Sequence, residues 1–305
     1  METPTRTPLL LETGIGADTE PMLAMLHKPG RGGGVKKLGL VIPIGGPQIR
    51  SGAHRQYIDL ADASAAAGFP TLRFDYPGLG DSPGEDVGFG SHQVFLSSAA
   101  RGFLAEVPEL THLAFWGLCE GASTILLLND SSLPIAGAIL ANPWLGEDGQ
   151  DAGRLKHHYG ARLLSWSFWG RVLRGDVNVL SAGLGLVSGV AQVIKQKIGG
   201  RFDQSKSDGK ALDPGPLDLR ARMREGAAQL EGNIFWILSG RDLTAKHFES
   251  FVKARPEWQS LVQSQNVLRL DEADHTFSDP SMKQRVNTQT VAWLETLWAK
   301  RKSGE

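Results

Sequence analysis

Continuously apolar runs alternate with amphipathic segments along much of the chain. The runs at residues 38–44 (LGLVIPI), 112–118 (HLAFWGL) and 135–141 (IAGAILA) read as strands that are covered on both faces. Between them, residues 54–67 and 93–107 have the apolar spacing of helices. Strands that alternate with helices require crossover connections, so the pattern predicts an α/β fold with a mostly parallel sheet and helices on both faces.

The same alternation returns near the C-terminus. Further strands are predicted at residues 71–76, 234–238 and 267–270, a short helix at 121–129, and a last helix at 281–300. We find no internal repeat and no low-complexity tract.

The alternation breaks between Trp144 and Leu217, where helix-like pieces occur without a clear strand. We therefore predict an α/β core in two parts, residues 1–144 and 217–305, interrupted by a helical lid insertion at 145–216. The longest uncharged stretch of the insertion, residues 177–194, holds polar side chains and glycines and is too short to span a bilayer. Contact between the lid and a membrane surface stays an open alternative.

Composition narrows the classes of function. Lys and Arg total 32 against 33 Asp and Glu, so the balance gives no electrostatic case for nucleic-acid binding. One cysteine excludes an intrachain disulfide framework and a multi-thiolate metal site. A free thiol fits a reducing compartment, and the apolar run Leu9–Leu11 is too short for a secretory signal. We therefore predict a cytoplasmic protein without a metal or cofactor.

The single cysteine lies at the end of a predicted strand, in the pattern Gly117-Leu118-Cys119-Glu120-Gly121. A strand that turns sharply into a helix with this spacing is typical of a nucleophile elbow, where glycines avoid collisions with the neighbouring backbone. The helix N-terminus also favours a thiolate, which is the reactive form of the side chain. The alternative is that Cys119 is a small buried hydrophobic residue.

A thiol nucleophile needs a base, and the base needs an acid that orients it. Asp242 and His275 each follow a predicted strand, and the chain order of nucleophile, acid and base is the one expected for this type of elbow. The alternatives are a helix cap for Asp242 and an ordinary surface loop for His275. Asp271 and Asp274 are rival acids, although both lie close to His275 in sequence.

An oxyanion hole needs two backbone N–H donors. We expect one from Glu120, which follows the nucleophile, and one from Gly46 in the loop after the third strand. Pro47 has no N–H and is excluded. The alternative for the two glycines of this loop is a plain turn.

Several motifs together resemble known hydrolases. The segment Asp75–Ser82 (DYPGLGDS) resembles the turn after the fourth strand of α/β hydrolases, and it is a packing signature. More narrowly, the chain resembles the exosortase A system-associated hydrolase 1 family through GGPQIRSGAHRQ, LRFDYPGLGDS, WGLCEGAS and RLKHHYGARLLSWSFW. The resemblance implies an α/β-hydrolase fold, a Cys–His–Asp triad and an association with bacterial exosortase and exopolysaccharide systems. Glu120 departs from the family pattern, which has Asp there. A cysteine elbow also resembles dienelactone hydrolases, but the insertion and the GGPQIR loop differ from them.

Candidate substrate contacts come from cationic and aromatic side chains. Basic residues of the insertion and of the loop after the third strand are expected to attract a carboxylate, phosphate or coenzyme A group, unless they form a solvated face. Tryptophans are expected to line an acyl pocket, unless they simply pack the insertion. The candidates are Arg50, His54, Arg55, Trp144, Tyr159 and Trp166.

Three functions fit these residues. The first is a cysteine hydrolase that cleaves an ester or thioester of a small molecule through an S-acyl enzyme. The second is an acyltransferase with the same intermediate, because thioesters react readily with amines and thiols. The third is a non-catalytic scaffold on the same fold, although the complete order of Cys119, Asp242 and His275 weighs against it.

Overall fold

The computed structural model of the protein describes residues 3–14, 20–30, 32–146, 216–230, 232–263 and 265–303. These residues belong to one compact unit. The lid insertion predicted at 145–216 lies almost entirely outside the described residues. So do its uncharged stretch at 177–194 and two candidate substrate contacts, Tyr159 and Trp166.

The described strands form a single eight-stranded sheet in the order β1-β2-β4-β3-β5-β6-β7-β8. Strands β1, β2 and β4 pair antiparallel, and every pair from β4 through β3 to β8 is parallel. This confirms the predicted α/β class. The strands are β1 (Thr5–Leu11), β2 (Met22–Lys28), β3 (Leu38–Ile42), β4 (Thr71–Phe74), β5 (His112–Leu118), β6 (Ile135–Ala141), β7 (Ile234–Ser239) and β8 (Asn266–Leu270).

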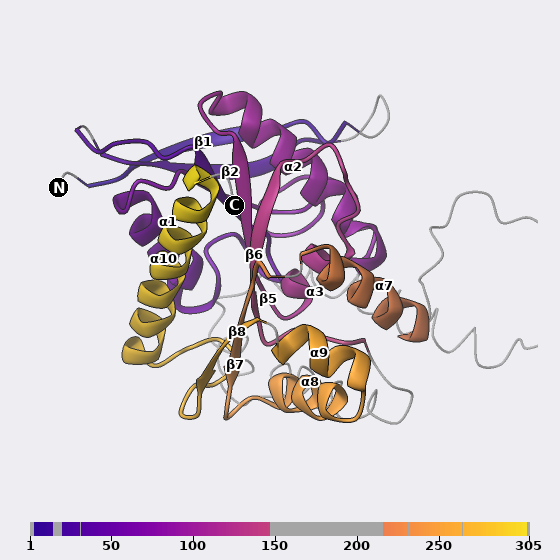
Figure 1. Cartoon of the computed structure of the whole chain (residues 1–305). Helices are drawn as coiled ribbons and strands as arrows, with labels where there is room; N and C mark the ends of the chain where they lie inside the picture. Colours follow the sequence, from indigo (N-terminus) through magenta and orange to yellow (C-terminus); the bar gives the residue numbers. More distant parts are fainter. Residues whose placement is uncertain are drawn as a thin grey trace, which may run out of the picture. The chain divides into compact units, whose positions relative to one another are not determined.

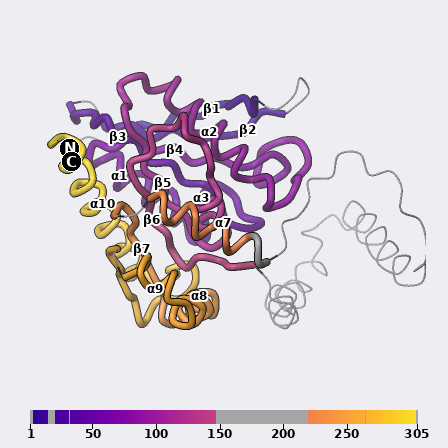
Figure 2. Tube along the Cα trace, turned by 45° about the vertical axis from the view of Figure 1, so that its right-hand side comes forward, coloured from indigo at the N-terminus to yellow at the C-terminus, as the bar shows by residue number. Residues whose placement is uncertain are grey.

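Helices cover both faces of the sheet (Figures 1 and 2). Helices α1 and α10 pack against each other on one face, and α3 packs against α2 and α7 on the other. Two layers of helices bury the central strands completely, which explains why β3, β5 and β6 are apolar at nearly every position. The helices are α1 (Gln56–Ala66), α2 (His92–Glu106), α3 (Glu120–Leu127), α7 (Pro216–Gln229), α8 (Leu243–Lys253), α9 (Pro256–Gln263) and α10 (Pro280–Ser303).

Several strands and helices begin or end at other residues than the sequence predicts. The strand predicted at 38–44 ends at Ile42, and the one predicted at 71–76 ends at Phe74. The helix predicted from residue 54 is a short 3-10 turn at Ala53–Arg55, followed by α1. His54 and Arg55 have positive φ angles of 51° and 61°, so the α-helix cannot begin before them.

The analysis of the sequence missed the N-terminal hairpin of β1 and β2 and the helices α7 and α9. Strand β1 is an exposed edge strand that contains Pro8, a residue that edge strands tolerate and central strands do not. Its apolar run was too short to indicate a strand. The hairpin adds the antiparallel edge of the sheet.

The parallel strands bring distant loops to one edge of the sheet. The carboxyl ends of β3, β5, β7 and β8 lead into residues 43–52, the turn at Cys119, residues 240–242 and residues 271–277. Ligands of open α/β sheets bind at this edge. The candidate site lies among these loops.

Candidate active site

Cys119 occupies a tight, strained turn between β5 and α3. Its backbone angles are φ 57° and ψ −122°, a conformation that residues other than glycine rarely adopt. Its amide donates to the carbonyl of Ala141 over 3.0 Å, which fixes the turn to the end of β6. The surrounding structure therefore holds the thiol on a bend that the chain would not adopt by itself.

The glycines on either side of the turn have the steric role expected from the sequence. A Cβ atom on Gly117 would lie 2.5 Å from the carbonyl carbon of Gly121, which is closer than real side chains approach. A Cβ atom on Gly121 would lie 3.3 Å from the carbonyl oxygen of Ile44. The backbones of β5, of α3 and of the loop after β3 are therefore in direct contact around Cys119.

Cys119 is 8% exposed and is the N-cap residue of α3. Ser123 is the first residue of α3 whose amide donates within the helix, to the carbonyl of Cys119 at 3.2 Å. The positive end of the α3 dipole therefore lies at Cys119, where it favours a negative charge.

Asp242 and His275 lie together although they are far apart in sequence. They follow the neighbouring parallel strands β7 and β8, and Nδ1 of His275 lies 2.9 Å from Oδ2 of Asp242. The distance is that of an ion pair, while the angle at Nδ1 is not that of a well-directed hydrogen bond.

The His275 ring interacts with both Asp242 and Cys119. Burial of the ring opposes its protonation, but its contacts with the carboxylate of Asp242 and with the sulfur of Cys119 outweigh burial. Together they raise the pKa of His275 to about 10. The three residues therefore interact with one another through the imidazole ring of His275.

The rival acid Asp274 makes its hydrogen bonds within its own loop. Asp274 accepts hydrogen bonds from Thr276 N (3.2 Å) and Ser278 N (2.9 Å), so its carboxylate stabilises its own turn. Burial opposes the ionisation of Asp274, but the hydrogen bonds from Ser278 and Thr276 and the charge of His54 lower its pKa overall. Asp242 also caps α8, accepting from Thr244 N (3.2 Å) and Ala245 N (3.0 Å). The helix-cap alternative for Asp242 therefore holds in addition to its contact with His275.

The loop after β3 reaches the Cys119 turn at Gly45 and Gly46. A Cβ atom on Gly45 would lie 2.2 Å from the carbonyl oxygen of Leu118, so only glycine fits there. Gly46 has a φ of 66°, and a Cβ atom on it would lie 3.7 Å from Oε2 of Glu120. The two residues predicted to donate to an oxyanion are thus neighbours in space, next to the nucleophile candidate.

Arg50 does not contribute a free cation to this edge. Its guanidinium pairs with Asp75 and, at 2.8 Å, with Asp81, and its backbone amide also donates to Asp75. Asp75 is completely buried. Its charge neutralises a buried carboxylate and ties the 43–52 loop to the turn after β4, while a contact with substrate stays a prediction.

The other described candidates for substrate contact take different places. His54 lies near Asp274, and its carbonyl accepts a hydrogen bond from Lys283 Nζ at 3.1 Å. Arg55 is exposed. Trp144 adjoins the Cys119 turn, because its amide donates to the carbonyl of Cys119 at 3.4 Å. Its ring packs edge-on against Phe89, with ring centroids 5.1 Å apart.

Asn142 is a residue of the site that the sequence analysis did not single out. It is completely buried with a φ of 44°, and its side chain donates to Ser239 Oγ (2.9 Å) and to the carbonyl of His275 (3.3 Å). Its side-chain oxygen Oδ1 accepts from Ser239 N at 2.9 Å. Asn142 thereby fastens the His275 loop to the ends of β6 and β7. A polar residue directly after an apolar strand was the available signal.

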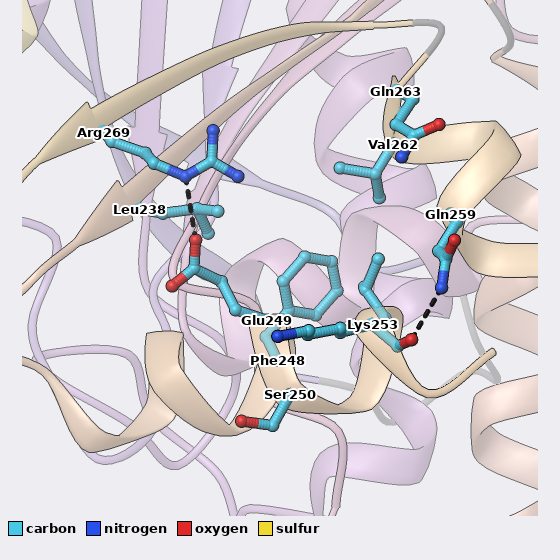
Figure 3. Close-up of a pocket in the computed structure, with 10 residues that line it drawn as sticks. Leu238, Phe248, Glu249, Ser250, Lys253, Gln259, Val262, Gln263 and Arg269 are labelled. Atoms are coloured by element: carbon cyan, nitrogen blue, oxygen red, sulfur yellow. Dashed lines mark hydrogen bonds and ion pairs between the residues drawn. The ribbon is translucent and has the colours of Figure 1, made fainter. Parts of the chain in front are cut away.

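A cavity of about 640 Å³ lies apart from these residues, between α8, α9 and β8 (Figure 3). Buried apolar side chains, including Leu238 and Phe248, form its base, and an ion pair between Arg269 and Glu249 (3.0 Å) lies beside it. Cys119, Asp242 and His275 do not line it. This cavity is therefore separate from the candidate site.

Within the described residues, no cluster of three or more His, Cys, Asp or Glu side chains is arranged to hold a metal ion. None of the helices in the same stretches combines the length and the apolar character that crossing a bilayer requires.

The mostly parallel sheet, the turn at Cys119 after β5, and the acid and histidine after β7 and β8 together define the α/β-hydrolase fold. Solved structures support the same class. The chain is similar to the esterase Pf2001 of Pyrococcus furiosus, with a TM-score of 0.59 and 15% identity, over 96% of this chain and 92% of that one. It is also similar to Est1E from Butyrivibrio proteoclasticus, with a TM-score of 0.57 and 11% identity, over 96% and 99% of the two chains.

A dienelactone hydrolase from Anabaena variabilis gives a TM-score of 0.57 at 12% identity, over 97% of this chain and 99% of that one. No protein-family model and no curated protein matches the sequence. The structural likeness establishes the α/β-hydrolase fold of this chain.

Proposed function

We propose that the protein is a hydrolase that cleaves an ester or thioester with Cys119 as nucleophile, through an S-acyl enzyme. The observation that carries the proposal is the contact of the His275 ring with Asp242 on one side and Cys119 on the other. A nucleophile, a base and an orienting carboxylate in contact are the parts that covalent acyl transfer requires. The esterase neighbours of the fold agree with this chemistry.

Acylation would begin from the thiolate of Cys119 and the imidazolium of His275. The sulfur attacks the carbonyl carbon of the substrate, and the resulting oxyanion accepts hydrogen bonds from the amides of Gly46 and Glu120. When the tetrahedral intermediate collapses, the leaving alkoxide or thiolate takes the proton from His275. An S-acyl Cys119 and a neutral imidazole remain.

Deacylation reverses these roles. His275 removes a proton from water as the water attacks the thioester, and the second tetrahedral intermediate expels the thiolate of Cys119. The carboxylic acid leaves, and the thiolate and imidazolium form again. The carboxylate of Asp242 stabilises the imidazolium in both halves of the reaction.

The test offers purified protein a panel of short- and long-chain acyl esters and thioesters and follows intact mass and product release. Because Cys119 is the only thiol of the chain, a mass increase that disappears in Cys119→Ala identifies the acylated atom. We expect an acyl adduct and turnover with water alone. A wild-type protein that never acylates with any substrate of the panel would overturn the proposal.

Adding an acyl acceptor to the assay distinguishes hydrolysis from acyl transfer. If product forms only when an amine or alcohol is added, the same S-acyl enzyme serves an acyltransferase.

Three further expectations remain predictions of the sequence. They are the link to exosortase and exopolysaccharide systems, the cytoplasmic location and the contact between lid and membrane. The proposed substrate is a small acyl compound. The expectation that this substrate is anionic does not rest on Arg50, because the Arg50 guanidinium is paired with the carboxylates of Asp75 and Asp81.

A further inference from the structure

The cavity between α8, α9 and β8 takes no part in the proposed reaction, because Cys119, Asp242 and His275 do not line it. Its volume of about 640 Å³ is typical of sites that hold small molecules. The described residues that line it all come from residues 238–269, so one part of the chain builds its walls. We call it the α8–α9 cavity.

The base of the α8–α9 cavity is apolar and firmly packed. Four side chains form it, and each is at most 9% exposed: Leu238, Phe248, Val252 and Val262. The Phe248 ring stacks on Trp236, with centroids 5.2 Å apart, and meets Trp258 edge-on at 6.1 Å. A fixed apolar base favours the apolar part of a ligand, because covering it removes apolar surface from water.

The walls of the cavity are also tied to each other. The side chain of Gln259 in α9 lines the cavity, and its Nε2 donates to the carbonyl of Lys253, the last residue of α8, at 2.6 Å. This hydrogen bond joins the two helices at the rim (Figure 3). The cavity is therefore formed before any ligand enters, which lowers the cost of binding one.

The rim carries an excess of positive charge. Among the described residues that line the cavity, three side chains are charged: Lys253, Arg269 and Glu249. Two cations against one carboxylate leave one net positive charge. Figure 3 shows these three side chains around the ring of Phe248. An occupant with a single negative charge complements this rim.

Both cations keep hydrogen-bond donors for such an occupant. Arg269 donates to Glu249 through Nε, over 3.0 Å, and its two terminal nitrogens make no hydrogen bond within the described stretches of the chain. The ammonium group of Lys253 forms no ion pair with any described residue. The planar end of an arginine matches the two oxygens of a carboxylate, and a lysine adds a second charge-assisted donor.

We propose that the α8–α9 cavity is a binding site for a small amphipathic carboxylate, whose apolar chain lies on the base and whose carboxylate binds Arg269 and Lys253. No covalent bond forms or breaks there. The proposal does not depend on the function proposed for Cys119.

The test uses octanoate as the probe and the full-length protein with ¹³C-labelled methyl groups. The methyl signals of Val252 and Val262 report on this cavity and distinguish it from the site at Cys119. We expect octanoate to shift both signals along a saturable curve. It should bind roughly tenfold or more tightly than butanoate, because its longer chain covers more of the apolar base. Octylamine, with the same chain and the opposite charge, should bind at least as weakly as butanoate.

Charge variants test the rim. Lys253→Gln and Arg269→Gln alter exposed side chains, so both should fold as wild type does. Each should weaken octanoate binding by about threefold to tenfold, the effect of losing one partly exposed contact with a charged group. Lys246→Gln is the matched control, because Lys246 is an exposed lysine of α8 that does not line the cavity. It should leave the affinity unchanged.

Three results would overturn the proposal. The first is a lack of response of the Val252 and Val262 signals to octanoate. The second is equal affinity for octanoate, octylamine and octan-1-ol, since that pattern belongs to an apolar surface without charge selectivity. The third is wild-type affinity in both Lys253→Gln and Arg269→Gln. A protein that never acylates on Cys119 but still binds octanoate here would reject the hydrolase proposal and support this site.

Discussion

Nδ1 of His275 lies 2.9 Å from Oδ2 of Asp242, across the carboxyl ends of two neighbouring parallel strands. The contact depends on topology, because β7 and β8 pair in parallel and both end at the same edge of the sheet. The next strand along, β6, is followed directly by Asn142, whose side chain donates to the carbonyl of His275. Three adjacent strand ends thus determine where the imidazole lies.

Asp242→Asn should slow acyl turnover by about 10²–10⁴-fold, because an amide cannot stabilise the imidazolium and favours the wrong tautomer of His275. Asparagine caps helices about as well as aspartate, so the start of α8 should survive the change. The measurement is kcat with the best substrate of the panel, alongside urea unfolding.

Asp274→Asn is the control for this change, since Asp274 bonds to Thr276 and Ser278 of its own loop. It should leave kcat within a few-fold of wild type. Should Asp274→Asn abolish turnover while Asp242→Asn spares it, the acid would have to be reassigned.

The elevated pKa of His275 makes stability dependent on pH. The folded-state pKa of about 10 exceeds the ordinary value of 6.5, so between these pH values the folded protein binds more protons at this site than the unfolded chain does. The stability contributed by His275 is fully present below pH 6.5 and is lost as the pH rises through 10. We expect the difference in unfolding free energy between wild type and His275→Gln to shrink over that interval, measured by urea unfolding at several pH values.

A second variant separates the two contacts of the ring. Cys119→Ala removes one of the groups that raise the pKa of His275, so the ring should titrate at lower pH by NMR, while its contact with Asp242 keeps the value from falling to that of a buried unpaired imidazole. A titration identical to wild type would show that the sulfur does not reach the ring.

Gly117→Ala should destabilise the protein by about 3 kcal/mol or prevent folding, because the new Cβ would collide with the backbone of Gly121 and overpacked sites cannot relax cheaply. Gly34→Ala is the control, since nothing lies within 4 Å of a Cβ atom there. Thermal unfolding of the two variants checks the prediction. Equal melting temperatures would contradict the tight approach of strand and helix at the Cys119 turn.

Arg50→Gln should cost about 3 kcal/mol, because it leaves the buried carboxylate of Asp75 without its guanidinium partner. Arg55→Gln, at an exposed position of the same loop region, should have almost no effect on stability. Unfolding in urea compares the two. A variant Arg50→Gln that is as stable as wild type but has a raised KM for anionic substrates would return Arg50 to the role of a substrate contact.

The central sheet and the approximate place of the candidate triad could be predicted from the sequence. Continuous apolar runs such as 112–118 and 135–141 indicate strands that are covered on both faces, and β5 and β6 have these bounds. The chain order of Cys119, Asp242 and His275 placed each residue at a strand end. Parallel pairing then brings those ends to one edge without any further information.

Other features depend on contacts that no local pattern contains. Arg50 and Asp75 are distant in sequence, so the ion pair between them could not be predicted before the fold was known. The left-handed backbone at His54 and Arg55 breaks a segment whose apolar spacing is helical. The edge strand β1 pairs on one side only and is largely exposed, so its sequence carries little of the apolar signal on which strand prediction relies.

The carboxylate of Asp242 both starts α8 and faces His275. A replacement of Asp242 that cannot cap a helix would therefore remove the start of α8 and the partner of the imidazole in the same step, whereas asparagine would remove only the carboxylate. In related chains, a capping residue without a carboxylate at this position would mark a lineage that kept the helix start and gave up the imidazole partner.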